Sequence, residues 1–350
     1  MYTKEFVDNL KKDNEVYVVT SDGVPVSDKV YPIINAWKIP ALSVLVEIIN
    51  KIKPDIIDYQ YPTTAYRRKL FSNILPLLLL IRGIKTPLIT TFHEFAEVKV
   101  LGKLRSFLLF TLSPNVIFKN KADLDILLPY SIHKKCKFIP LGASILRAKT
   151  SQKKRNTLKS KLNIPEDNTI LIFYGFLDEN KGIDDLISAL GILHSENIKV
   201  TLIIVGGYKD QTYYNYLNTL ANTSGISESI RWLGFIGDDD LGPYFAIADI
   251  AVLPYKNGVS YRRSTLLTAM AHELPIISTN GPYVPHSFVN NNNIMLIDPN
   301  KPIQISQAII KILNDKILRS RLEMGSRSLI KMHDWEKVVN ETVSFYSETL

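Results

Sequence analysis

The sequence predicts an α/β protein made of two doubly wound domains that face each other across a cleft. Its 350 residues are enough for two domains of ordinary size. In the second half, short β-branched runs alternate with helix-like stretches, a pattern typical of a parallel sheet covered on both faces. The first half repeats the alternation less regularly. Ligands of such sheets bind beyond the carboxyl ends of the strands, so the cleft is the expected place for a site.

The second half supplies the clearer elements. Its strands are expected at Thr169–Phe176, Val200–Gly207, Ile230–Ile236, Ile250–Tyr255, Pro275–Thr279 and Ile294–Asp298. Its helices are expected at Lys181–His194, Gln211–Ala221, Asp239–Ala248, Ser264–Ala271 and Pro302–Asn314. We place this second domain at residues 162–331, after a polar and basic linker at residues 151–161.

The first domain, residues 1–150, begins unusually. Its strands are expected at Glu15–Thr20, Asp55–Tyr61, Leu88–Phe92, Asn115–Phe118 and Lys137–Leu141, and its helices at Thr3–Lys12, Ala41–Lys51, Tyr66–Ile81 and Lys121–Leu128. A doubly wound domain normally opens with a strand and a Gly-rich turn. Either this domain lacks its first strand, or further sequence precedes it.

Composition narrows the class of protein. Apolar residues make up 46% and charged residues 22%, as in soluble globular enzymes. The single cysteine, Cys136, excludes a disulfide framework and a Cys-rich zinc site, and it fits a reducing compartment. The apolar run Ile74–Ile81 is too short to span a bilayer, and the N-terminus has no signal-peptide region. We expect a cytoplasmic protein.

Charge is distributed unevenly along the chain. Up to Lys161 there are 27 basic and 13 acidic residues, a net charge of +14, whereas the remainder carries −6. A half this basic is attracted to polyanions such as nucleic acid, anionic lipid or a lipid-linked phosphate. Nucleic acid is disfavoured, because the sequence has no stacking motif or recognition helix.

A lysine follows the first strand of the second domain. In the segment Tyr174–Leu186, a strand ends at Gly175 and Lys181-Gly182 opens a helix. A cation at a helix N-terminus is misplaced unless an anion binds there and uses both the lysine and the helix dipole. A solvated surface lysine is the alternative. Neither the phosphate loop of nucleotide triphosphatases nor a G-x-G-x-x-G fingerprint occurs.

This segment resembles the Lys-Gly signature of retaining nucleotide-sugar glycosyltransferases of glycosyltransferase family 4. Further matches follow in order at Leu202–Gly207, Trp232–Ile236, Ala248–Tyr255 and Leu267–Ile277, and in the first half at Lys53–Ile57, Thr91–Glu94 and Ile139–Gly142. The resemblance implies the GT-B fold of two Rossmann-like domains, with the nucleotide in the second. It also implies that residues 332–350 form a closing helix that crosses back to the first domain.

Two family features are missing. The family's Glu-x7-Glu pair falls on Ser260 and Thr268, and an arginine of its diphosphate site falls on Phe176. We expect Arg262 or Arg263 to replace that cation, because arginine offers a planar fork suited to phosphate. Solvated arginines, or arginines paired with carboxylates, are the alternative. Ser264 or Thr265 can cap the helix that follows.

The resemblance implies a set of site residues. The donor would be held by Gly175, Lys181, Gly207, Phe235, Gly258, Ser260, Arg262, Arg263, Thr265 and Thr268. The catalytic candidates are His93, Lys181 and Ser260; His93 follows the strand Leu88–Phe92 and could instead be a structural histidine. No acidic or histidine cluster has metal-ligand spacing, so we expect neither metal nor cofactor beyond the donor.

Basic and apolar residues adjoin in the first domain. Arg67, Arg68 and Lys69 precede the helix ending at Ile81, and Lys99, Lys103 and Arg105 precede an apolar run from Phe107. This pattern suggests contact with an anionic membrane on its inner face, with the apolar side chains mostly buried. A buried helix with solvated charges at its end is the alternative.

Together these features predict a metal-independent, retaining hexosyltransferase. It would move a sugar from a nucleotide diphosphate to a lipid-linked or polysaccharide-precursor acceptor. Loss of both glutamates leaves open a non-catalytic relative that binds nucleotide sugar or a partner enzyme. A nucleotide-sugar epimerase of the same fold is disfavoured, because the second half lacks a convincing set of acid and base carboxylates.

Overall fold

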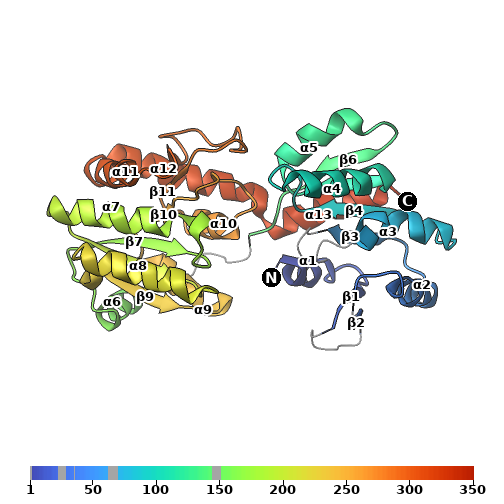
Figure 1. Ribbon diagram of the computed structural model, residues 1–350, viewed down its shortest axis with the longest axis horizontal. Helices are drawn as coiled ribbons and strands as arrows, with labels where there is room; N and C mark the ends of the chain where they lie inside the picture. The colour runs from blue at the N-terminus through green and yellow to red at the C-terminus, as the bar shows by residue number, and fades with distance from the viewer. Residues whose placement is uncertain (1, 23–28, 35, 62–69, 144–150) are drawn as a thin grey trace. The chain divides into compact units, whose positions relative to one another are not determined.

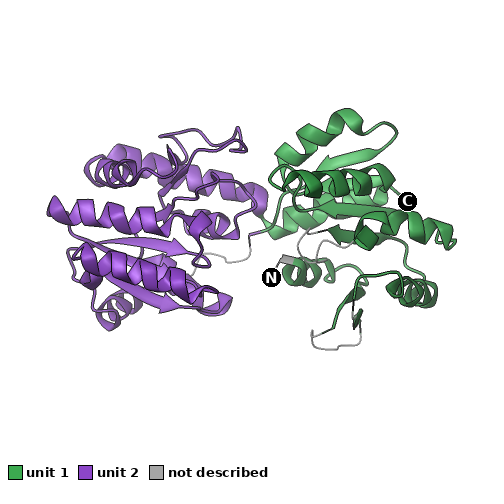
Figure 2. Cartoon of the chain, in the orientation of Figure 1, with its two compact units in different colours: residues 1–142, 334–350 green, residues 143–333 purple. Residues whose placement is uncertain are grey.

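The computed structural model describes residues 2–22, 29–34, 36–61, 70–143 and 151–350. They form two compact units (Figure 2). Unit 1 comprises Met1–Gly142 together with Asp334–Leu350, and unit 2 comprises Ala143–His333. The chain therefore leaves unit 1 once and returns to it for its last segment. Each unit contains a parallel sheet, which confirms the expected α/β class.

Unit 2 is a doubly wound six-stranded sheet (Figure 1). Its strand order is β12-β11-β10-β7-β8-β9, and all neighbouring strands are parallel. The strands are β7 (Thr169–Tyr174), β8 (Val200–Val205), β9 (Ile230–Gly234), β10 (Ile250–Leu253), β11 (Ile276–Thr279) and β12 (Met295–Ile297). The direction of winding reverses between β7 and β10. This is the switch point where ligands of open α/β sheets bind.

The helices of unit 2 fall into two groups. They are α6 (Gln152–Lys161), α7 (Ile183–Ser195), α8 (Gln211–Thr223), α9 (Asp238–Ile247), α10 (Ser264–Ala271), α11 (Pro302–Asn314) and α12 (Lys316–Ile330). Helix α7 contacts α8 and α11, whereas α10 contacts α12 and α9 contacts α6. Right-handed connections on either side of the switch point place the two groups on opposite faces of the sheet.

Unit 1 has a four-stranded sheet with the order β3-β4-β5-β6. The strands are β3 (Ile57–Tyr61), β4 (Leu88–Phe92), β5 (Asn115–Phe118) and β6 (Lys135–Phe138); β1 (Val18–Ser21) and β2 (Val30–Ile34) pair only with each other. The main sheet of the described residues thus begins at Ile57. The strand expected at Glu15–Thr20 lies outside it.

Helices cover both faces of the unit 1 sheet. They are α1 (Tyr2–Leu10), α2 (Ala41–Ile52), α3 (Leu70–Ile81), α4 (Val100–Leu112), α5 (Lys121–Leu127) and α13 (Trp335–Ser347). One core joins α2, α3 and α4 to the aromatic side chains Tyr61, Phe92 and Phe118. On the other face, Val338 and Phe345 of α13 pack on Ile89, Ile117 and Ile139, and α1 packs on α13.

Three expectations about the elements are wrong. The expected linker 151–161 forms α6, because Ser151 accepts a hydrogen bond from the Lys154 N–H and the lysine-rich sequence favours helix. The strand expected at Lys137–Leu141 lies earlier, at β6. Lys181 does not open α7: it ends a short 3-10 turn, Glu179–Lys181, and α7 begins at Ile183.

Unit 1 exposes apolar side chains on two of its helices, including the end of the helix expected to stop at Ile81. Helices α3 and α4 contact each other. On α4, Val100 and Leu101 are each 73% exposed and Leu104 is 63% exposed, while on α3 Leu80 and Ile81 are 66% and 69% exposed. Lys99 beside them is exposed as well. The basic group Arg67, Arg68 and Lys69 lies outside the described residues. No described helix combines the length and hydropathy needed to cross a membrane.

Candidate functional site

Lys181 lies where the loops after β7 and β10 meet. The Asp178 side chain accepts a hydrogen bond from the Asn180 N–H (2.9 Å) and so fixes the 3-10 turn. Gly182 follows with φ +68°, and a Cβ there would lie 2.0 Å from the Pro254 carbonyl oxygen. Only glycine allows this approach, which brings the two loops together at the switch point.

An ion pair reinforces the junction of the two loops. The Lys256 Nζ lies 2.7 Å from Asp184 Oδ2, in the first turn of α7. The Lys256 N–H also donates to the Asn180 carbonyl oxygen (3.0 Å). Lys256 therefore ties the loop after β10 to the start of α7, and its charge is neutralised by a carboxylate.

Lys181 and Arg263 share one aromatic ring. The Lys181 Nζ is 5.3 Å from the centroid of Tyr255, and the Arg263 guanidinium carbon is 4.7 Å from it. Among the described residues, neither side chain forms an ion pair with a carboxylate, and Arg263 Nε is buried without a hydrogen-bond partner. Burial, followed by the charge of Arg263, lowers the pKa of Lys181. Two adjacent cations, offset only in part by the charge of Asp178 acting on Lys181, favour binding of an anion.

Tyr255 is the support of this cation pair, and sequence reasoning missed it. Its side chain is fully buried, and its hydroxyl is hydrogen-bonded to Thr265 Oγ1. Burial raises the pKa of Tyr255 to about 12, so the phenol stays neutral. The position directly after Pro254 at the carboxyl end of a buried strand was the available signal.

The loop before α10 holds several predicted residues in place. Gly258 has φ +81°, and a Cβ there would lie 2.6 Å from the Cα of Gly281. Ser260 is 2% exposed and Arg262 is half-buried. The expected caps Ser264 and Thr265 do not cap α10, because Arg263 occupies the N-cap position without a side-chain bond.

The hydroxyl groups of Thr268 and Thr265 both form hydrogen bonds within unit 2. Thr268 is 1% exposed, and its hydroxyl donates to the Ser264 carbonyl oxygen (3.0 Å). Thr265 is 8% exposed and faces Tyr255. A glutamate carboxylate at position 268 of α10 would need room that a buried threonine does not require.

Exposed aromatic rings lie on the other side of the β7 end. A Cβ at Gly207 would lie 3.8 Å from ring or Cβ atoms of both Phe176 and Phe235. Phe235 is 75% exposed and Phe176 is 53% exposed. The Lys209 Nζ lies 5.5 Å from the centroid of Phe176. Gly175, next to Phe176, donates its N–H to the Val205 carbonyl oxygen (2.9 Å). Exposed rings after β7 and β9 suit the stacking of a planar base.

His93 belongs to unit 1, whereas Lys181 and Ser260 belong to unit 2. His93 follows β4 and is half-buried, and its Nε2 lies 2.8 Å from Gln60 Oε1. The described residues hold no cluster of three His, Cys, Asp or Glu side chains that could bind a metal ion.

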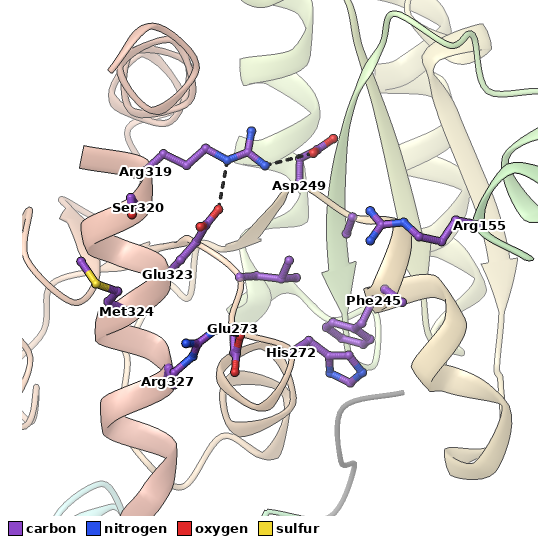
Figure 3. Close-up of a pocket in the computed structure, with 13 residues that line it drawn as sticks. Arg155, Phe245, Asp249, His272, Glu273, Arg319, Ser320, Glu323, Met324 and Arg327 are labelled. Atoms are coloured by element: carbon purple, nitrogen blue, oxygen red, sulfur yellow. Dashed lines mark hydrogen bonds and ion pairs between the residues drawn. The ribbon is translucent and has the colours of Figure 1, made fainter. Parts of the chain in front are cut away.

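A cavity of about 620 Å³ lies near the amino ends of strands β10 and β11 of unit 2 (Figure 3). Its lining includes Asp249 and Leu274, which precede β10 and β11, and none of the predicted site residues. Figure 3 shows Arg319 between Asp249 and Glu323, with both distances 3.1 Å. Arg319 and Arg327 of this cavity are paired with the carboxylates Asp249, Glu323 and Glu273, so it offers a weaker anion site than the Lys181–Arg263 pair.

Comparison with known proteins identifies the family. The sequence profile described as Glycosyl transferases group 1 matches residues 154–328, half of the chain. The chain belongs to this family. As a group 1 glycosyltransferase it has the GT-B fold of two Rossmann-like domains. The matched region contains the whole Lys181–Arg263 site, so the family assignment and the site come from the same unit.

Similar proteins include several glycosyltransferases. An uncharacterized glycosyltransferase of Methanocaldococcus jannaschii is 24% identical over 201 residues, covering 56% of this chain and 49% of that protein. The GDP-mannose-dependent alpha-(1-6)-phosphatidylinositol monomannoside mannosyltransferase of Mycobacterium tuberculosis is 24% identical, covering 51% of this chain and 47% of that protein. The chain thus aligns with about half the length of these relatives.

Solved structures share the fold. Anabaena HepE, solved in complex with UDP and glucose, has a TM-score of 0.72 at 16% identity, covering 90% of this chain and 84% of that one. Sucrose-phosphate synthase of Thermosynechococcus elongatus has a TM-score of 0.73 at 17% identity, covering 99% and 92%. Likeness at this level of identity concerns the fold.

Proposed function

We propose that this group 1 glycosyltransferase moves a sugar from a nucleotide diphosphate donor, held by unit 2, to a lipid-linked or polysaccharide-precursor acceptor. The observation that carries the proposal is the pair of cations, Lys181 and Arg263, on the buried ring of Tyr255. A diphosphate supplies the negative charge that the site lacks. Phe176 and Phe235 are then placed to contact the base.

The cation pair also suggests how the enzyme accelerates transfer. When the bond between sugar and diphosphate breaks, negative charge grows on the leaving oxygen. Cations already in place stabilise that charge without the cost of reorganising solvent. Arg263 supplies the charge that Phe176 lacks, so we propose transfer without a metal ion. Retention of the anomeric configuration follows the family resemblance and is part of the same proposal.

The surface of unit 1 supports a lipid-linked acceptor. The apolar side chains Val100, Leu101 and Leu104 are exposed next to Lys99 on α4. Apolar side chains flanked by cations fit the interface of an anionic bilayer, where the chains insert and the cations meet headgroups. We therefore propose a peripheral contact of unit 1 with the inner face of a membrane, which also accounts for the basic first half.

Calorimetry with nucleotides tests the donor site. We expect a nucleoside diphosphate to bind more tightly than the matching monophosphate, because the second phosphate engages both cations. Affinity should be unchanged by EDTA. Equal affinity for mono- and diphosphate would contradict the proposed site, and a strict need for Mg²⁺ would contradict the metal-independent mechanism.

A further inference from the structure

One face of the unit 1 sheet carries a row of polar side chains. Side chains two residues apart on a strand share a face, and so do neighbours in a parallel register. Asp58 and Gln60 of β3 therefore face the same way as Thr91, which pairs with Gln60 in register. This is the face that α13 covers. The row leads along the strands toward His93, directly after β4.

Asp58 accepts every hydrogen bond recorded for it. Thr91 Oγ1 donates to Oδ1 (2.8 Å), while Gln60 Nε2 (2.8 Å) and the Tyr346 hydroxyl donate to Oδ2. Burial raises the pKa of Asp58 above its usual range, and these bonds and the charge of Lys119 offset only part of that rise. Three donors converging on one carboxyl group suit its ionised form, which can only accept.

The carboxylate decides which way the Gln60 amide faces. With Nε2 against Asp58, the amide oxygen Oε1 lies 2.8 Å from His93 Nε2. The reversed amide would place its oxygen against a carboxylate oxygen, where two acceptors repel. Because Oε1 can only accept, His93 Nε2 must donate, and it therefore carries a proton.

We propose that Asp58 and Gln60 are positioning residues that hold the proton of neutral His93 on Nε2. Proton exchange and acceptance of a hydrogen bond then take place at Nδ1. In this tautomer the lone pair of Nδ1 is always an acceptor, the form that suits a hydrogen bond from a hydroxyl group, whereas a ring with both tautomers offers that acceptor only part of the time. This consequence rests on the proposed sugar transfer, but the tautomer itself does not.

A second histidine of this chain, His272, is an internal reference because its proton is expected on the other ring nitrogen. His272 Nδ1 lies 2.9 Å from the Thr268 carbonyl oxygen. A carbonyl oxygen only accepts, so neutral His272 carries its proton on Nδ1. His272 is 6% exposed and lies in unit 2, far along the sequence from the Asp58–Gln60 pair.

Long-range ¹H–¹⁵N spectra of the full chain, ¹⁵N-labelled at histidine and free of ligand, test the proposal. They are recorded near pH 8.5, where ordinary imidazoles are neutral. We expect His93 to show a protonated Nε2 and a bare Nδ1, and His272 to show the reverse. A His93→Asn variant assigns the signals.

Two substitutions of Gln60 separate positioning from packing. Gln60→Leu removes the acceptor, so the His93 nitrogens should shift toward the average of two tautomers. Gln60→Glu keeps an acceptor oxygen beside His93, and a proton shared between its second oxygen and Asp58 replaces the amide hydrogen bond, so this variant should preserve the wild-type tautomer. The His272 signals should stay unchanged in both variants, as a control for unit 2, and slow hydrogen exchange of the β4 and β5 amides shows that unit 1 is folded.

Two outcomes overturn the proposal: a wild-type His93 that is protonated on Nδ1 or mixed, and a single unchanged tautomer in Gln60→Leu. If Gln60→Leu does not fold, Asp58→Asn decides. An asparagine there can present either amide atom to Gln60, so we expect a mixture of both tautomers at His93. An unchanged tautomer would show that Asp58 does not orient Gln60. Because no ligand is present, these results are independent of whether nucleotide diphosphates bind.

Discussion

Arg263 is the arginine of the loop before α10 that lies over an aromatic ring. Arg263 lies over Tyr255 beside Lys181. Its charge lowers the pKa of Lys181. The two cations repel each other, and an anion bound between them offsets this repulsion. We therefore expect the pair to contribute to ligand binding more than to the stability of the fold.

Arg263→Ala should therefore weaken binding of a nucleoside diphosphate by about 2–5 kcal/mol, as expected for removing one partner of a desolvated charge contact. Arg262→Ala is the matched control and should retain most of the affinity. Isothermal calorimetry measures both. Normal binding by Arg263→Ala, or a greater loss in Arg262→Ala, would remove Arg263 from the diphosphate site.

Lys119 is a buried cation in unit 1. It is 1% exposed, and burial lowers its pKa to about 8. Between about pH 8 and the ordinary lysine pKa near 10.4, the unfolded chain binds a proton that the folded chain does not. The free energy of unfolding should therefore rise with pH across this window.

Comparison with Lys119→Met isolates this effect. From about pH 8 to 9.5, wild-type stability should rise by about 1–2 kcal/mol relative to the variant, at most 1.36 kcal/mol per pH unit. Urea titrations at several pH values measure the difference. A difference that stays constant with pH would show that Lys119 keeps its ordinary pKa in the folded protein.

Among the elements, α4 gives the membrane proposal its sharpest test. Leu101 and Leu104 are exposed, so Leu101→Glu with Leu104→Glu should leave the fold intact. Burying one such side chain contributes about 1.5–3 kcal/mol. Co-sedimentation with anionic vesicles should therefore fall by more than tenfold.

A control on a different helix distinguishes insertion from charge. Ile317 of α12 is 73% exposed in unit 2, and Ile317→Glu should leave vesicle binding nearly unchanged. Raising the salt to 1 M should weaken the electrostatic part alone. Equal loss in both variants would indicate a general effect of added negative charge and contradict insertion of α4.

The sequence predicted the elements that stand out as apolar runs between polar segments, and it missed helices without such a pattern. The strands of unit 2 are near-continuous apolar runs, and β7 to β12 all lie within the expected ranges. Helix α4 lacks a capping side chain, and its run Phe107–Phe110 puts apolar residues on every side of the helix, which obscures its start and its buried face. Helix α12 was missed although the Asp315 side chain, which accepts from the Leu318 N–H (2.9 Å), was a readable start signal.

The candidate site was only partly predictable for a different reason. Lys181 and Arg263 could be singled out because a cation before a helix needs an explanation. Their common support, Tyr255, depends on the distance between two loops that lie far apart in sequence. The Asp58–Gln60–His93 contacts likewise depend on strand register, which a single sequence does not reveal.

At the scale of the whole molecule, the last helix determines the stability of the first unit. Phe345 of α13 is 2% exposed and packs with Ile89 and Ile117. Phe345→Ala should lower the free energy of unfolding of unit 1 by about 3–5 kcal/mol. Unit 2 should unfold as before.

Hydrogen exchange resolved by peptide measures the two units separately. Amides of β4 and β5 should exchange faster in Phe345→Ala, whereas those of β7 and β8 should not change. Uniform acceleration in both sheets would mean that the two units unfold as one cooperative body, contrary to their division into separate cores.

The two crossings of the chain between units lie next to each other: the Ala143 N–H donates to the His333 carbonyl oxygen (2.8 Å). During translation this arrangement reverses the usual order in which the N-terminal domain folds first. Unit 2 is continuous and has its whole chain once His333 has left the ribosome. Unit 1 must wait for α13, so the isoleucines of its sheet stay uncovered while the ribosome makes nearly two hundred further residues. We therefore expect the nascent first unit, rather than the second, to be the segment that chaperones bind during synthesis.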